Sequence, residues 1–281
     1  MKDSPDKDDS LPRRLRMVLL HLAEEADRDI KSLRRNPARA VHAIRTRMKN
    51  LRAVLRLVHE GLPKPARKAI SMSAKSLKDA LAAQRDADSV ANWKRKFAAG
   101  HAGSRSPGKT VIPPGITGKM RTEAARLVRL VSRTDLRGTT IQQVISAYVR
   151  CYSAGRKGLR RCLRDDDVEK LHEWRGPVKT LFYQSRILKP LDGMKRRLRG
   201  ADQLGDILGK LSDLRLIAAD ATGPDAASLL KRVEKMKAEL KKRAFKRAAK
   251  LFGSKPRKVA KELRQCVKFL PSLIGLCARQ A

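Results

Sequence analysis

The sequence predicts an all-α protein made of two similar helical halves. Apolar residues recur along most of the chain with the spacing of amphipathic helices, and alternating runs of β-branched residues are nearly absent. The 281 residues, 41% of them hydrophobic, can bury a sizeable core, which excludes a disordered polycationic tail. A pattern of residues also returns at a constant offset along the chain, which indicates an internal duplication.

Four helices are predicted in the first half, residues 13–136. Asn36 is a favourable N-cap and Pro37 suits a first helical position, so a helix should begin there and end at the Gly-Leu-Pro sequence of residues 61–63. A stretch rich in Gly, Pro and Ser, residues 98–118, favours a long loop. The helices are then expected over residues 13–35, 37–60, 64 to beyond 81, and 119–133. Residues 1–12 are polar and acidic, and we expect them to form a disordered tail.

Five helices are predicted in the second half, residues 137–278. The three aspartates at residues 165–167 can cap the second of these helices and interact favourably with its dipole. The expected helices cover about residues 139–163, a segment after these aspartates, two segments after Pro190 and Pro224, and about residues 256–278. Residues 13–278 are therefore interpreted as one domain of two halves.

Two of these helices carry the same row of basic residues, which we call the first and second stripes. On an α-helix, positions 0, 3, 7, 10 and 14 lie along one face, within about 80° of arc and about 21 Å of length. The first stripe fills all five positions, with His42, Arg45, Lys49, Arg52 and Arg56. The second stripe lies at a constant offset of 130 residues and consists of His172, Arg175, Lys179 and Arg186.

Such rows indicate an anionic ligand. Cations at this spacing repel each other unless something anionic lies alongside them. The chain contains 66 Lys and Arg residues against 28 Asp and Glu residues, a formal net charge of +38. Nucleic acid, an anionic membrane surface and polyphosphate are the plausible partners, and a solvated basic surface without a ligand is the alternative.

A second repeated segment follows each stripe. Its matched residues, at an offset of 127, are Leu77, Asp79, Leu81 and Asp86 in the first half and Leu204, Asp206, Leu208 and Asp213 in the second. Each half is therefore interpreted as one copy of a helical bundle, and packing about a pseudo-two-fold axis would bring the stripes to one shared surface or channel. Lys68, Lys75 and Lys78 share one face of the third helix and extend the expected site.

The sequence contains no clear catalytic or metal motif. Neither stripe has a Glu or a second His at ligand spacing, so His42 and His172 are expected to donate hydrogen bonds to phosphate rather than to bind a metal. No P-loop motif occurs either. The four cysteines form no CxxC pair, the N-terminus does not resemble a signal peptide, and the apolar run at residues 17–23 is too short to span a membrane. We therefore expect a cytoplasmic protein without a membrane partner or a cofactor.

The pattern His-x-x-Arg-x-x-x-Lys, followed by further basic residues on the same face, occurs twice. Each copy precedes a leucine-rich segment that carries Asp86 in the first half and Asp213 in the second. In these features the chain, from about residue 13 to 278, resembles the CHAD family, the conserved histidine α-helical domain. The resemblance implies two pseudo-symmetric helical bundles around a basic central groove or pore. It also implies binding of inorganic polyphosphate and, in several bacterial members, targeting to polyphosphate granules.

The resemblance assigns the site residues by position. It makes His42 and His172 the motif histidines and the other stripe residues the ligand-binding cations. Asp86 and Asp213 are the acidic positions, and we expect each to orient a stripe arginine through a salt bridge or to cap a helix. Many family members carry a triphosphate-hydrolase module with an ExExK motif, which this sequence lacks. The chain is therefore interpreted as a binding module and not an enzyme.

The second copy departs from the pattern. Phe182 stands at the position of Arg52, and Gly176-Pro177 interrupts the first turns of the predicted helix, where a bend is expected. Ser212 also stands where the first copy has Arg85. We therefore expect the first stripe to dominate binding.

Two other functions remain open at this point. Charge alone permits a nucleic-acid or nucleoid-associated protein, although aromatic residues make up only 4% of the chain and no helix-turn-helix or zinc finger is evident. A phosphate-transferring enzyme would have to turn over polyphosphate or triphosphate with a divalent metal.

Overall fold

The computed structural model describes residues 10–84, 86–87, 91, 112–165, 168–222 and 226–268. The regular elements in these residues are α-helices, which confirms the predicted all-α class. The main helices are α1 (Leu11–Lys31), α2 (Pro37–Leu57), α3 (Lys64–Asp79), α5 (Ile116–Ser132), α6 (Ile141–Arg164), α7 (Val168–Ile187), α8 (Met194–Ala219), α9 (Ala226–Phe252) and α10 (Pro256–Lys268).

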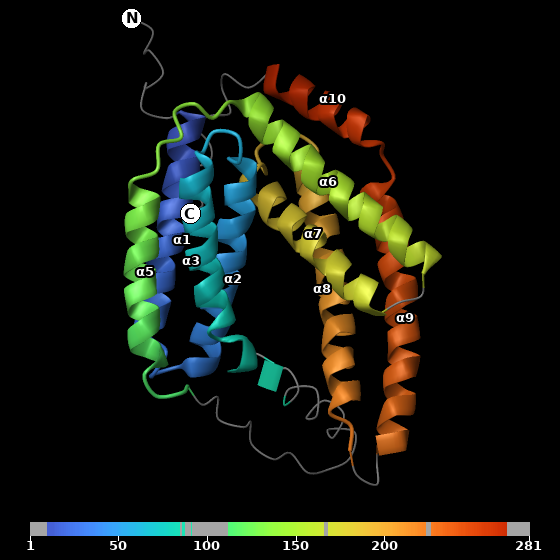
Figure 1. Cartoon of the computed structure of the whole chain (residues 1–281). Coiled ribbons are helices and arrows are strands. Elements are labelled where there is room, and N and C mark those ends of the chain that lie inside the picture. The colour runs from blue at the N-terminus through green and yellow to red at the C-terminus, as the bar shows by residue number, and fades with distance from the viewer. Residues whose placement is uncertain are drawn as a thin grey trace, which may run out of the picture.

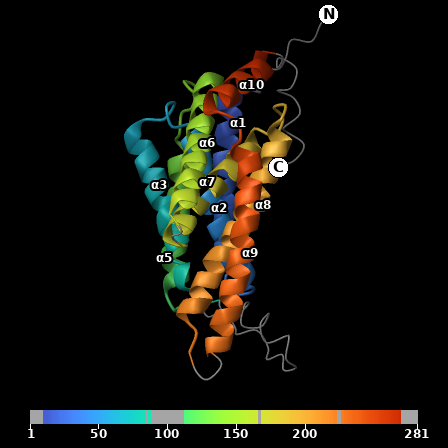
Figure 2. The same ribbon diagram turned by 90° about the vertical axis from the view of Figure 1, so that its right-hand side faces the viewer.

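The helices form two bundles with the same order of neighbours (Figure 1). In the first bundle, α1 packs on α2 and α5, and α3 packs on the same two helices. In the second bundle, α7 lies between α6 and α8, and α9 packs on α8 and α6. A view turned by 90° shows the long helices running in similar directions, with α10 at one end (Figure 2). The shared neighbour order makes α2 the counterpart of α7 and α3 the counterpart of α8, as an internal duplication requires.

Local sequence signals explain where the key helices begin. The Asn36 side chain accepts a hydrogen bond from the Arg39 amide at 3.4 Å, and Pro37 opens α2, as predicted. At the start of α6, Thr140 and Gln143 form a reciprocal capping box. Gly193 precedes α8 with a φ of 72°, a conformation that glycine adopts without strain.

One continuous core links the two bundles. On α2, the fully buried side chains of Ile44, Met48 and Leu51 lie on the face next to the first stripe. On α7, Trp174 is 2% exposed and its indole Nε1 donates to the carbonyl oxygen of Gly155 on α6 at 2.8 Å. The core therefore fixes the rotation of both stripe helices about their own axes.

The two stripe helices meet each other directly. Gln184 Nε2 of α7 donates to the carbonyl oxygen of Ala53 on α2 at 3.1 Å, and both groups are buried. Arg56 Nη1 of α2 donates to Thr180 Oγ1 of α7 at 3.0 Å. These contacts lie in the C-terminal halves of the two helices, which diverge toward their N-termini (Figure 1).

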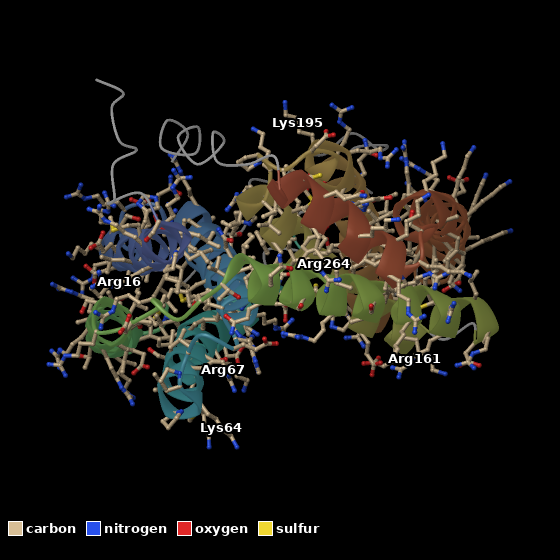
Figure 3. All side chains as sticks on the ribbon, turned by 90° about the horizontal axis from the view of Figure 1, so that it is seen from above. Arg16, Lys64, Arg67, Arg161, Lys195 and Arg264 are labelled. Atoms are coloured by element: carbon tan, nitrogen blue, oxygen red, sulfur yellow. The ribbon has the colours of Figure 1, made fainter. Side chains whose placement is uncertain are left out.

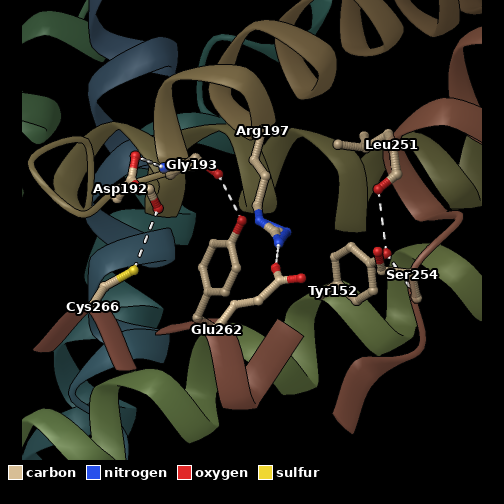
Figure 4. A network of polar contacts seen from close by, with 10 residues as sticks. Tyr152, Asp192, Gly193, Arg197, Leu251, Ser254, Glu262 and Cys266 are labelled. Atoms are coloured by element: carbon tan, nitrogen blue, oxygen red, sulfur yellow. Dashed lines mark hydrogen bonds and ion pairs between the residues drawn. The ribbon is translucent and has the colours of Figure 1, made fainter. Parts of the chain in front are cut away.

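The last described helix, α10, docks on the second bundle through a polar network (Figure 4). The guanidinium of Arg197 on α8 is nearly buried and forms an ion pair with Glu262 of α10. The Cys266 thiol donates a long contact of 3.9 Å to the carbonyl oxygen of Asp192. Tyr152 of α6 donates to the carbonyl oxygen of Ser254 at 2.9 Å, just before α10 begins.

Some predicted boundaries differ from the structure. Helix α1 begins at Leu11, so Leu11 and Pro12 belong to it and not to the predicted tail; Pro12 is tolerated because it lies in the first turn. Pro177 lies in the middle of α7 rather than in its first turns, and the helix continues across it; the bend expected there stays a prediction. Residues 1–9, most of the predicted loop 98–118 and residues 269–278 of the predicted last helix lie outside the described residues.

Candidate polyanion-binding site

The first stripe follows α2 beside the packed core. His42 and Arg56, at its two ends, are exposed, whereas Arg45, Lys49 and Arg52 between them are half-buried. Burial lowers the pKa of the Arg52 guanidinium, and the charge of Arg56 lowers it further. Burial and repulsion by Arg56 both disfavour the charged form of Arg52, and an anion beside the two guanidinium groups would relieve the repulsion between them.

Helix α3 lies along the first stripe. Arg45 Nη1 donates to the carbonyl oxygen of Lys78 at 2.7 Å, which ties the stripe to the C-terminal turn of α3. Asp79 pairs with the ammonium groups of Lys78 at 2.8 Å and Lys75 at 3.4 Å. Burial alone would raise the pKa of Asp79, but hydrogen bonds and charge from these two lysines lower it. The structure thus brings Lys78, predicted to extend the site, to the first stripe.

The second stripe has the same relation to α8. His172 and Arg186 are exposed, while Arg175 and Lys179 are half-buried. Lys179 Nζ lies 2.9 Å from Asp206 Oδ1 and 3.8 Å from Asp202 Oδ1, both on α8. These two cations lie flat against α8 because it presents glycines to them. A Cβ atom would come within 2.8 Å of Lys179 Cε at Gly205 and within 3.2 Å of Arg175 Nη2 at Gly209.

His172 is held in a defined orientation. Its Nδ1 lies 3.2 Å from Ser212 Oγ, and the Ser212 hydroxyl donates to the carbonyl oxygen of Leu208 at 2.9 Å. With the hydroxyl proton directed to Leu208, the Ser212 oxygen can accept a hydrogen bond from Nδ1 in the tautomer of His172 that carries its proton there. Arg215 and Lys237 line the same small cavity of about 10 Å³, close to the space that one water molecule occupies. Ser212 thus has a positioning role that its place in the repeat did not indicate.

The two stripes approach each other where α2 and α7 meet. Thr180 Oγ1 donates to the carbonyl oxygen of Gly176 at 3.0 Å, so it accepts the hydrogen bond from Arg56 at the end of the first stripe. His42 and His172 stand near the diverging N-terminal ends of the two helices (Figure 1). The two stripes together contain seven arginines and lysines and two histidines, and these lie on two adjoining helices. Binding of a long anionic polymer would require such an arrangement.

The chain also matches a known protein family. A family model described as the CHAD domain matches the chain over residues 16–142 and 119–222, which together span most of its length. The chain belongs to the CHAD domain family. Two matches in one chain are also consistent with an internal duplication. Neither the curated proteins nor the solved structures gave a match.

Aromatic rings occupy the gap in the second stripe of this CHAD domain. Phe182, which replaces a cation at the position of Arg52, has its ring centroid 5.1 Å from Lys179 Nζ. The Arg186 guanidinium lies 5.8 Å from the centroid of the Tyr183 ring. Both contacts are cation–π interactions, so the rings hold the two neighbouring cations without adding a charge.

Two carboxylates other than Asp86 and Asp213 act on the cations of the stripes. Asp86 and Asp213 are half-buried and each takes part in a polar interaction, but their orienting role stays a prediction. Asp206 contacts a stripe lysine, and Asp79 contributes to the charge around Arg52. The repeat had already aligned Asp79 with Asp206, so that alignment was the signal that pointed to them.

Positive charge also covers the rest of the CHAD domain. Basic side chains lie on both bundles, and their nitrogen tips surround the molecule, as at Arg16, Lys64, Arg67, Arg161, Lys195 and Arg264 (Figure 3). The C-terminal end of α6 has a wide hollow of about 450 Å³, lined by Lys157, Arg160, Arg161, Leu163 and Arg164. This hollow is the strongest rival of the stripes as an anion site, because its basic residues are all exposed.

Neither a metal-ligand cluster nor a membrane-spanning helix is found in the described part of the chain. Among the described residues, no three His, Cys, Asp or Glu side chains gather as they would around a metal ion. No helix in the same residues combines the length and the apolar character needed to cross a membrane.

Proposed function

We propose that the chain binds inorganic polyphosphate through the first and second stripes. The observation that carries this proposal is the contact between α2 and α7, because it brings equivalent basic rows from the two halves onto adjoining helices. Membership of the CHAD family, which is associated with polyphosphate binding, supports the same ligand. We further propose that the ligand lies in a basic central groove or pore between the bundles and that the protein associates with polyphosphate granules in the cytoplasm.

The chemistry of the stripes suits a phosphate polymer. Polyphosphate presents closely spaced negative charges, and the stripes present basic side chains along one helix face at about one per turn, about 5.4 Å apart along the axis, with a gap at Phe182 in the second stripe. Arginine can bind two oxygens of one phosphate, lysine acts as a point charge, and histidine donates a hydrogen bond. No step of this role needs a nucleophile or a metal, so we propose a binding module rather than an enzyme.

The two stripes should contribute unequally. The first stripe has a histidine, arginine or lysine at all five positions, whereas the second has Phe182 at one of them. Lys179 of the second stripe is also held by Asp206 before any ligand arrives. We therefore propose that the first stripe dominates, so Arg45→Ala should weaken binding more than Arg175→Ala.

A titration of long-chain polyphosphate tests the site. The double variant Arg45→Ala/Arg175→Ala removes one half-buried arginine from each stripe and should weaken binding at least tenfold, because charged hydrogen bonds contribute about 1.5–3 kcal/mol each. The matched control, Arg160→Ala/Arg161→Ala, removes the same charge from the hollow on α6. Equal losses in the two variants, or no loss in the first, would show that the stripes are not the site.

Nucleic-acid binding is the second candidate function, and the basic surface on both bundles favours it (Figure 3). A competition experiment between duplex DNA and polyphosphate at physiological salt distinguishes this function from polyphosphate binding. If the stripes serve polyphosphate, an excess of duplex DNA should leave the bound polymer in place; displacement would favour the nucleic-acid function. A phosphate-release assay with a divalent metal would in turn detect an enzyme.

A further inference from the structure

We propose that Asp202 and Asp206 of α8 are internal competitors of the ligand, which occupy Lys179 of the second stripe until polyphosphate displaces them. The proposal rests on the proposed function, because it concerns how the same site is regulated. It concerns two carboxylates of α8 rather than Asp86 and Asp213, the acidic positions of the family pattern.

Both carboxylates lie beside the same ammonium group. Lys179 Nζ is 2.9 Å from Asp206 Oδ1 and 3.8 Å from Asp202 Oδ1. The Lys179 side chain is 20% exposed and that of Asp206 is 64% exposed, so water partly screens this contact. A lysine ammonium has three donors, so a phosphate oxygen can bind it either by sharing the ammonium with the carboxylates or by replacing them.

The first half has a different charge arrangement at the equivalent positions. At the offset of 127 residues, Asp206 corresponds to Asp79, whereas Asp202 corresponds to Lys75. Asp79 is shared by two lysines of its own helix, Lys75 and Lys78. In the second half, two carboxylates instead lie near one stripe lysine. Lys179 of the second stripe is therefore partly neutralised by the protein itself.

Two physical effects follow for a phosphate chain. The contacts between Lys179 and the two carboxylates are weakened or given up, and the carboxylates also repel the phosphates beside them. Both effects oppose binding at the second stripe. The polymer should therefore engage the first stripe first and reach the second once its bound end raises the local concentration of phosphate there.

The test uses the full chain and a polyphosphate of defined length at fixed salt. Asp206→Asn removes the closer carboxylate with little change in shape, and we expect about twofold to fivefold tighter binding, the range given by an exposed ion pair. Asp202→Lys introduces the residue type of Lys75 and should tighten binding further. The matched control is Asp27→Asn on α1, where Asp27 pairs with Lys31 at 2.7 Å away from both stripes. That control adds the same charge and should change the affinity less than about twofold.

A second background shows whether the effect acts through Lys179. In a Lys179→Met protein, Asp206→Asn should tighten binding clearly less than in wild type, because only the repulsion between this carboxylate and the phosphates remains to be removed. Equal tightening in both backgrounds would overturn the proposal, since it would mean that the carboxylates only repel the ligand at a distance. Weaker binding by Asp206→Asn in a protein with an unchanged melting temperature would overturn it as well, because the carboxylates would then position Lys179 for the ligand. If the proposed function itself is wrong, the result is different. The wild-type protein then does not bind polyphosphate, or the Arg45→Ala/Arg175→Ala variant binds it as tightly as wild type does.

Discussion

Replacing Gly158 by alanine should force α6 and α7 apart and loosen the second stripe. A Cβ atom at this position would lie 2.2 Å from Cδ1 and 2.9 Å from Cγ of Trp174. The indole cannot move aside easily, because it is 2% exposed, stacks 6.4 Å from Phe245 and donates a hydrogen bond to Gly155. Trp174 directly precedes Arg175, so the stripe moves with it.

The expected change in the free energy of unfolding is the sum of opposing contributions. Overpacking a core costs about 1–3 kcal/mol, and a weakened indole hydrogen bond adds about 1 kcal/mol. The gain in helix propensity from glycine to alanine returns about 1 kcal/mol. The net expectation for Gly158→Ala is therefore a loss of about 1–3 kcal/mol in the free energy of unfolding.

Urea denaturation measures this loss, and Gly118→Ala is the matched control. Gly118 lies in α5, and no heavy atom would lie within 4 Å of an added Cβ. The control should therefore be more stable than wild type, by about 0.4–1 kcal/mol. If Gly158→Ala were as stable as Gly118→Ala, the close packing of α6 on α7 would be refuted.

Three further predictions concern other parts of the fold. Glu262→Ala leaves the nearly buried Arg197 without its ion-pair partner (Figure 4), so it should lower the free energy of unfolding by about 1–3 kcal/mol in urea denaturation; an unchanged value would argue against the docking of α10. Thr140→Ala removes the capping box of α6 and should cost about 1 kcal/mol in the same assay, whereas Thr140→Ser should cost little. Burial raises the pKa of Cys151 to about 12, so its thiolate fraction at pH 8 is very small and should increase only as the pH approaches that value. Mass spectrometry after iodoacetamide treatment should find Cys151 unmodified in the native protein at pH 8, and rapid modification would contradict its burial.

Most of the fold could be predicted from the helical spacing of the residues and from the internal repeat. The spacing of His42, Arg45 and Lys49 placed them on one face of α2 because helix geometry alone determines which residues share a face. Asn36 and Pro37 gave the start of that helix for the same local reason. Pro177 shows the limit of such rules. Helix α7 continues across it, and buried Trp174 and Val178 anchor the helix on both sides.

Contacts between distant segments could not be read from the sequence. Arg56 and Thr180 are 124 positions apart, and no local rule connects an arginine of one half to a threonine of the other. The ion pair of Lys179 with Asp206 depends on how α7 turns its stripe toward α8, which tertiary packing decides. The repeat aligned Asp206 with Asp79, but alignment of two residues does not show which cation each one contacts.

The dependence of polyphosphate affinity on salt concentration tests the central claim most directly. Each phosphate contact made by a stripe cation should contribute about 0.7–0.9 to the slope of log affinity against log salt, by analogy with nucleic-acid binding. The account predicts that Arg45→Ala/Arg175→Ala makes this slope shallower by about 1.5, because two such contacts are lost. It also predicts a smaller change for Arg160→Ala/Arg161→Ala in the hollow on α6. A slope that stays at the wild-type value in the stripe variant would contradict the assignment of the two stripes as the polyphosphate site.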